Sequence, residues 1–205
     1  GINGSGGVNA TEASVFNKDP IGTAYLSITG GTVVINTSSD GIDTNGKVEM
    51  SGGLVIISGP TTGMQGAIDY DTTFEISGGI LVATGAAGVQ QKNPSSSSTQ
   101  NTVTAYLTAT TTQMIRIENA DGDTLFSYTP EKSYQTLVFS SPDLENNQTY
   151  KVYVGGTVVD PVTNISGYTT NGSYSNGTLL GSFTVTSSLN TVGTPIVTDD
   201  RPPRP

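Results

Sequence analysis

The sequence LSITGGTVVI, residues 26–35, contains the pattern that decides the fold of this chain. It returns as VEMSGGLVII at 48–57 and as FEISGGILVA at 74–83. Each copy has two alternating apolar residues, Ser or Thr, a Gly-Gly pair and a second apolar run. The second Gly lies at positions 31, 53 and 79, so the repeats are 22 and 26 residues apart. A repeat of this length indicates an architecture built from one supersecondary unit per repeat.

Each repeat has room for two short strands and no helix, which predicts one coil of a parallel β-helix. Alternation along the first strand points one apolar set inward, as for Leu26 with Ile28 and Val48 with Met50. The Gly-Gly pair supplies a tight corner that a Cβ would obstruct. The alternative is an antiparallel sandwich with similar hairpins. We expect an all-β protein with about four coils over residues 1–92.

The repeat pattern ends at a Ser-rich loop predicted over residues 93–102. Longer strands follow, so residues 103–188 are expected to form a β-rich C-terminal module that caps one end of the coils. Within it, NADGDT at 119–124 is a hairpin signal, because Asp-Gly favours a turn with positive φ. Residues 189–205 end in DDRPPRP and are predicted to be an extended Pro-rich tail.

The composition excludes several classes of function. The net charge is −9 with only eight Lys and Arg, so no basic face for nucleic acid is expected. No apolar run is long enough to span a bilayer. The chain has neither Cys nor His, which leaves oxygen ligands and a hard cation as the expected metal chemistry. Seven N-x-S/T sequons occur, at Asn3, Asn9, Asn36, Asn147, Asn164, Asn171 and Asn176.

Acidic turns between the repeats are the candidate metal site. The residues are Asp40, Asp43 and Asn45 in SDGIDTNG and Asp69 and Asp71 in AIDYD. If the coils stack in register, Asp43 and Asp69 lie on neighbouring rungs about 4.8 Å apart. Like charges so close need a neutralising partner, and calcium prefers carboxylate, amide and carbonyl oxygens. The alternative is that Asp and Asn are here simply as good turn formers.

The linked motifs resemble a known family. The stretch from SITGG at 27–31 through AIDYD at 67–71 and FEISGG at 74–79, together with SYQTLVFSSPDL and TYKVYVGG, is similar to secreted bacterial and archaeal carbohydrate-binding β-helix proteins. The resemblance covers residues 1 to about 185. It implies a right-handed parallel β-helix shaped like pectate lyases, bound calcium, and binding of cellulose-like or acidic polysaccharides without cleavage. Members of that family usually carry further coils before the one that opens this chain.

Two residues are candidates for sugar binding. Tyr70 lies between two Asp and is expected either to stack on a sugar or to fill the space between coils. Lys47 follows an Asn-Gly turn. It is expected either to contact a sugar or to be simply a solvated surface charge. Arg116 and Glu118, two apart on one strand, are interpreted as a surface charge pair. The coil region contains Lys18, Lys47 and Lys92 as its only bases and no evident acid of raised pKa, so no enzyme is expected.

The expected function is therefore that of an extracellular or cell-surface, non-catalytic polysaccharide-binding protein, stabilised by calcium. The alternative is a structural subunit of an extracellular filament or sheath. Nothing obvious in the sequence caps the first coil, so residues 8–25 or another subunit are the candidate caps. An uncovered coil end offers unpaired backbone groups to another chain. End-to-end stacking or strand exchange at this open end would produce a homopolymer.

Overall fold

The computed structural model describes residues 3–5, 8–11, 24–62, 65–88 and 91–195. These residues form strands, turns and loops, so the described part has no helix that could cross a membrane. The strands are β1 (Asn3–Ser5), β2 (Val8–Thr11), β3 (Tyr25–Asn36), β4 (Ile42–Thr44), β5 (Lys47–Ser58), β6 (Ile68–Tyr70), β7 (Thr73–Gly85), β8 (Thr102–Thr111), β9 (Ile115–Asn119), β10 (Thr124–Tyr128), β11 (Tyr134–Ser140), β12 (Thr149–Val159), β13 (Thr163–Ile165), β14 (Tyr168–Thr170), β15 (Ser173–Thr184) and β16 (Leu189–Val192).

The strands form three sheets. An eight-stranded sheet has the order β1-β3-β5-β7-β11-β8-β16, with β2 also paired to β3. A six-stranded sheet has the order β13-β14-β10-β9-β12-β15, and β4 and β6 form a two-stranded sheet among the described residues. Parallel pairing joins β3 to β5, β5 to β7, β4 to β6 and β16 to β8, and the other pairs are antiparallel. The expected all-β class is confirmed, whereas the sheets as a whole are mixed rather than those of a purely parallel β-helix.

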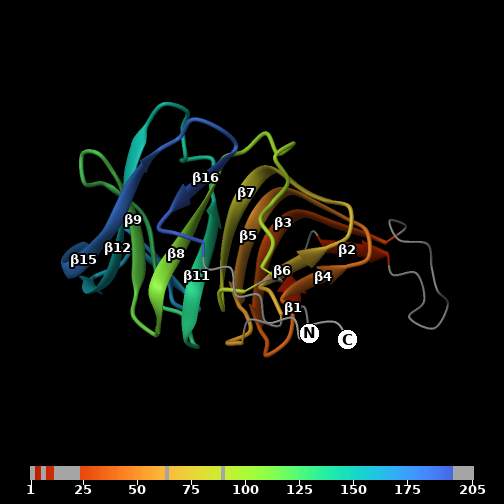
Figure 1. Ribbon diagram of the computed structural model, residues 1–205, viewed down its shortest axis with the longest axis horizontal. Coiled ribbons are helices and arrows are strands. Elements are labelled where there is room, and N and C mark those ends of the chain that lie inside the picture. Colours follow the sequence, from red (N-terminus) through yellow and green to blue (C-terminus); the bar gives the residue numbers. More distant parts are fainter. Residues whose placement is uncertain (1–2, 6–7, 12–23, 63–64, 89–90, 196–205) are drawn as a thin grey trace, which may run out of the picture.

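The three sequence repeats stack as β3, β5 and β7 (Figure 1), with equivalent repeat positions in register except at the bend. At the bend Gly31, Gly53 and Gly79 have φ values of 77°, 90° and 88°. A Cβ on Gly53 would lie 2.8 Å from the carbonyl oxygen of Gly31, and one on Gly79 2.7 Å from that of Gly53. The repeated Gly-Gly pair is therefore required both by the backbone conformation and by the close approach of the next strand.

The second halves of β5 and β7 are buried on both faces, which explains their continuous apolar runs, whereas Val34 in β3 is only partly buried. In β5, Val55 and Ile57 pack in a core enclosed by β3, β5, β7 and the opposing pair β4 and β6. Ile56 between them packs in a second core, shared with the C-terminal module. The first half alternates instead, since Val48 is fully buried and Glu49 is partly exposed.

The C-terminal module is a sandwich. Strands β8 and β11 of the eight-stranded sheet face β9, β10 and β12 of the six-stranded sheet (Figure 1). Aromatic residues from both sheets meet between them, as Phe126 of β10 and Phe139 of β11 stack with ring centroids 4.1 Å apart. The predicted hairpin is confirmed: β9 and β10 pair antiparallel, and Gly122 in their turn has φ 92°.

Both outer edges of the β3-β5-β7 stack are paired within the chain. On one side, β11 pairs with the second half of β7, and residues 95–100 of the Ser-rich segment follow its first half. There the hydroxyl oxygens of Ser95 and Ser98 accept hydrogen bonds from the backbone N–H groups of Phe74 (2.9 Å) and Ile76 (3.1 Å). On the other side, β1 and β2 pair antiparallel with β3. Residues 3–5 and 8–11 thus occupy the coil edge for which the sequence showed no obvious cap.

The predicted tail starts too early. Residues 189–192 form β16, which extends the eight-stranded sheet by parallel pairing with β8. Asn190 anchors this strand, because its buried amide donates to the carbonyl oxygens of Thr102 (3.1 Å) and Ser187 (2.8 Å). The segment carries an apolar residue at every third position only, so alternation alone did not mark it as a strand. The charged and Pro-rich residues 199–205 lie outside the described part of the chain.

Candidate functional site

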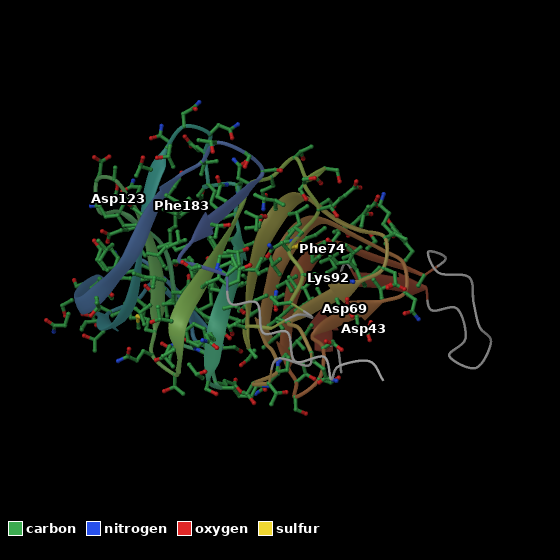
Figure 2. The ribbon with its side chains drawn as sticks, in the orientation of Figure 1. Asp43, Asp69, Phe74, Lys92, Asp123 and Phe183 are labelled. Atoms are coloured by element: carbon green, nitrogen blue, oxygen red, sulfur yellow. The ribbon has the colours of Figure 1, made fainter. Side chains whose placement is uncertain are left out.

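The predicted metal ligands lie on and around the two-stranded sheet of β4 and β6, here called the acidic column (Asp40, Asp43, Asn45, Asp69 and Asp71). The register pairs Asp43 directly with Asp69, and Figure 2 shows the two labelled side by side. Asp40 precedes β4, Asn45 follows it, and Asp71 follows β6. Stacking of two carboxylates on adjacent rungs is the arrangement that the repeat register predicted.

Lys92 supplies positive charge at one side of the acidic column. Its ammonium nitrogen lies 2.7 Å from Asp69 Oδ1 and also donates to the carbonyl oxygen of Tyr70. Its backbone N–H donates to the carbonyl oxygen of Ile68 (3.3 Å), which sets the side chain next to β6. The pKa of Lys92 is raised, chiefly by its bond to Asp69. A side-chain cation therefore neutralises Asp69.

Among the described residues, Asp43 has no such partner. Partial burial raises the pKa of its carboxyl above the ordinary value of 3.8, and the neighbouring charges of Asp40, Asp69 and Asp71 raise it further, against a lowering effect of Lys92. Asp40 is bonded to the next coil, since its Oδ1 accepts from the backbone N–H of Gly66 at 2.8 Å. Within the described ranges, no three acidic side chains converge closely enough to hold a metal ion. Calcium binding stays a prediction.

Tyr70 packs between the coil core and the segment that follows the coils. Its ring meets Phe74 edge to face at 6.2 Å between centroids, and the ammonium of Lys92 lies 5.2 Å from the ring centroid. Its hydroxyl donates to the carbonyl oxygen of Asn93 (2.7 Å). These contacts favour the second of the two interpretations, in which Tyr70 fills space between coils, and sugar stacking on its ring stays a prediction.

A polar groove crosses the first halves of β3, β5 and β7. It has a volume of about 330 Å³ and is lined by Ser27, Glu49, Ser51, Glu75, Ile76, Ser77, Ser97, Ser98 and Thr99. The parallel register places Ser27, Glu49 and Glu75 in one row, one residue per rung. Their side chains point away from the coil core because the residues on either side of each point into it. The groove therefore presents evenly spaced oxygen atoms along the stack.

Lys47 organises the carboxylates of this groove. Its ammonium nitrogen lies 2.5 Å from Glu49 Oε1 and 3.1 Å from Glu75 Oε2. The pKa of Glu49 is lowered by hydrogen bonds from Lys47 and from the Tyr25 hydroxyl, and that of Glu75 by hydrogen bonds from Ser97 and Lys47. Both carboxyls are therefore ionised at neutral pH. The carboxylates of Glu49 and Glu75 together with the ammonium of Lys47 carry a net charge of −1.

Sequence reasoning placed Lys47 among the candidates but missed Glu49, Glu75 and Ser27. The signal was present in the repeat itself. Each first strand has a polar residue between two apolar ones, in LSI, VEM and FEI, and stacking brings those three polar residues together. The repeat was used to predict the core and not the surface that the same alternation creates on the other side.

The interpretation of Arg116 and Glu118 as a surface pair is wrong. The side chains of the two residues are only 4% and 12% exposed, with Arg116 Nε 3.4 Å from Glu118 Oε2. They lie on the outer face of the six-stranded sheet, but Tyr174 of β15 covers the guanidinium. Arg116 Cζ lies 4.4 Å from the centroid of the Tyr174 ring. Sequence alternation predicts which face a residue occupies, and does not predict that a strand more than fifty residues later will cover it.

No protein-family model, curated protein or solved structure matches this chain. The resemblance to secreted carbohydrate-binding β-helix proteins stays a prediction from the quoted motifs. The candidate site is therefore defined by its own geometry, as the polar groove over β3, β5 and β7 with the acidic column of β4 and β6 as a candidate cation site.

Proposed function

We propose that this chain is an extracellular, non-catalytic protein that binds polysaccharide in the groove over β3, β5 and β7. The observation that carries the proposal is the row of Ser27, Glu49 and Glu75, which offers a polar side chain on each of three successive rungs. A linear glycan also repeats along one axis, so successive sugar units meet successive rungs about 4.8 Å apart. Tyr25, whose side chain bonds to Glu49 and is 37% exposed as a residue, adds an aromatic surface beside this row.

The charges favour a neutral, cellulose-like glycan among the polysaccharides that the sequence suggested. Ionised Glu49 and Glu75 accept hydrogen bonds from sugar hydroxyl groups, whereas uronate carboxylates would meet like charge. Serine and threonine hydroxyls around the carboxylates both donate and accept. Lys47 is already bonded to both carboxylates, so it contributes mainly by holding them in place.

The same charges support binding without cleavage. Hydrolysis of a glycosidic bond needs one carboxyl kept protonated by a raised pKa. Here the hydrogen bonds from Lys47, Tyr25 and Ser97 lower the pKa of both groove carboxyls, and neither is poised to donate a proton. We also propose that calcium binds at the acidic column, because the unpartnered charge around Asp43 would be relieved by a cation there.

We further propose that the parallel rungs are successive coils of a right-handed β-helix. Support comes from strands one repeat apart that pair in parallel both in β3, β5 and β7 and in β4 and β6. The filament alternative has less support. β1 and β2 already pair with β3, and β11 with β7, so end-to-end stacking would have to displace strands of the same chain.

Binding to insoluble cellulose and to soluble cello-oligosaccharides tests the proposed function. We expect the native chain to bind, and the double variant Glu49→Gln with Glu75→Gln to lose affinity about tenfold or more, as charge-assisted hydrogen bonds are removed. The control is Glu145→Gln, which removes an exposed carboxylate in the C-terminal module. Equal binding by the double variant, or binding to polygalacturonate alone, would contradict the proposed groove.

A further inference from the structure

The C-terminal module has a polar cavity of its own. It has a volume of about 560 Å³ and is lined by Arg116, Glu118, Gly122, Asp123, Thr124, Asn171, Gly172 and Tyr174. The lining comes from β9, the β9–β10 turn, the start of β10, the segment between β14 and β15, and the start of β15, on the face of the six-stranded sheet that points away from the core. Figure 2 labels Asp123, which lies in this module far from the acidic column. The cavity is called the β9–β15 cavity below.

Arg116 at the base of the β9–β15 cavity has unused hydrogen-bonding capacity. The residue is 4% exposed, its Nε lies 3.4 Å from Glu118, and its Nη1 is buried with no hydrogen-bond partner. Ser127, directly opposite Arg116 in the register of β9 and β10, is fully buried, and its hydroxyl also has no partner. Buried polar atoms are almost always hydrogen-bonded, so the orphaned Nη1 of Arg116, a residue that lines the cavity, indicates a missing partner there.

The chemistry of the lining defines that partner. Arg116 only donates, the carboxylates of Glu118 and Asp123 only accept, and Asn171 does both. A ligand anion would meet the two carboxylates, and a ligand cation would meet the guanidinium. Adjacent hydroxyl groups satisfy all of them, since one hydroxyl accepts from Arg116 while its neighbour donates to a carboxylate. A cavity of about 560 Å³ is within the size range of small-ligand sites.

We propose that the β9–β15 cavity binds a neutral sugar unit through adjacent hydroxyl groups. The proposal shares its ligand class with the function proposed for the groove, but it rests on different residues in a different module. It makes the protein a two-site glycan binder, with one extended groove and one pocket for a single unit. Either site can fail without the other.

Chemical-shift mapping with methyl glycosides of glucose, galactose and mannose tests the proposal. The protein is produced in a host without N-glycosylation, because Asn171 begins an N-G-S sequon. At least one glycoside should shift the backbone amides of residues 116–124 and 171–174, and methyl glucuronoside should shift them less. Arg116→Met should weaken binding about tenfold or more.

If the Arg116 variant fails to fold, Asp123→Asn tests the cavity instead. This variant is expected to fold, because Asp123 is exposed and the asparagine side chain can still accept the hydrogen bond from Asn119. Its matched control is Asp121→Asn in the same turn, which does not line the cavity. We expect the first to weaken binding and the second to leave it unchanged, while the groove variant Glu49→Gln has no effect on these shifts. Equal binding by Asp123→Asn and Asp121→Asn, or shifts confined to residues around 27, 49 and 75, would overturn the proposal.

Discussion

At the scale of single residues, Lys92 and Asp43 divide the acidic column into a neutralised and an unneutralised part. Lys92 forms an ion pair with Asp69 and neutralises its charge at the end of the column next to the Ser-rich segment. Asp43, one rung away, keeps a carboxylate among acidic neighbours, and burial together with these charges raises its pKa. The column is thus a place where the folded chain carries electrostatic cost that a bound cation would remove.

Asp43→Asn is expected to stabilise the protein at neutral pH in the absence of calcium. The folded-state pKa of Asp43 is raised, so the folded protein favours the protonated carboxyl. The resulting stabilisation is complete below pH 3.8 and is lost as the pH rises through the raised pKa, where the ionised carboxylate takes over. The gain should be under about 1 kcal/mol, since the carboxylate is exposed to solvent screening, and it should vanish at pH 3.

Thermal unfolding with and without millimolar calcium measures this gain. If calcium binds at the column, it should raise the melting temperature of the native chain and raise that of Asp43→Asn less. Asp143→Asn, an exposed carboxylate in the C-terminal module, is the control. An identical calcium response of the native chain and the Asp43 variant would remove Asp43 from the proposed cation site.

At the scale of elements, the bend within each repeat strand separates two surfaces with different roles. Before the bend, β3, β5 and β7 place polar side chains in the groove. After it, β5 and β7 are buried between the coil core and the C-terminal module. The Gly column at 31, 53 and 79 makes this change of direction possible. The Ser-rich segment then ends the stack, because serine hydroxyls take the place of the next backbone rung.

Gly53→Ala should destabilise the protein by about 2 kcal/mol or more. The substitution introduces a side chain at φ 90° and a Cβ 2.8 Å from the backbone of the preceding rung. The matched control is Gly30→Ala, since a Cβ there meets no atom of the described residues within 4 Å, and its change should stay within about 0.5 kcal/mol. Denaturant unfolding compares the two, and similar losses for both variants would argue against the close stacking of the bends.

At the scale of the whole molecule, one continuous eight-stranded sheet joins the repeat stack to the sandwich. β7 and β11 are neighbours in that sheet, so the C-terminal module completes the stack by direct strand pairing rather than by resting against its end. β1 and β2 pair along the opposite edge. Paired or covered edges are how β proteins avoid association through open strands.

The native chain is therefore expected to remain a monomer of about 21 kDa by light scattering, with or without calcium. A variant lacking residues 1–11 should associate in a concentration-dependent way, because it leaves the edge of β3 unpaired. Elongation of the native chain into fibres would favour the filament alternative and contradict this expectation.

Much of the architecture followed from local pattern, whereas the site followed only in part. The Gly-Gly repeats predicted the stack of β3, β5 and β7, and Asp-Gly at 121–122 predicted the β9–β10 hairpin. Prediction failed where partners are distant in the chain. β16 pairs with a strand that starts 87 residues earlier, and Tyr174 covers Arg116 from 58 residues away.

The sequence by itself determined the all-β class, the repeat register and the adjacency of Asp43 and Asp69, because each depends on periodicity and on conformational limits of single residues. The tertiary structure decided what surrounds those residues. Lys92 lies on Asp69, Tyr70 packs against Phe74, and Glu49 and Glu75 share one lysine in a groove. Local pattern sets which way a side chain points, whereas its charge partners and its cover come from segments that only folding brings near.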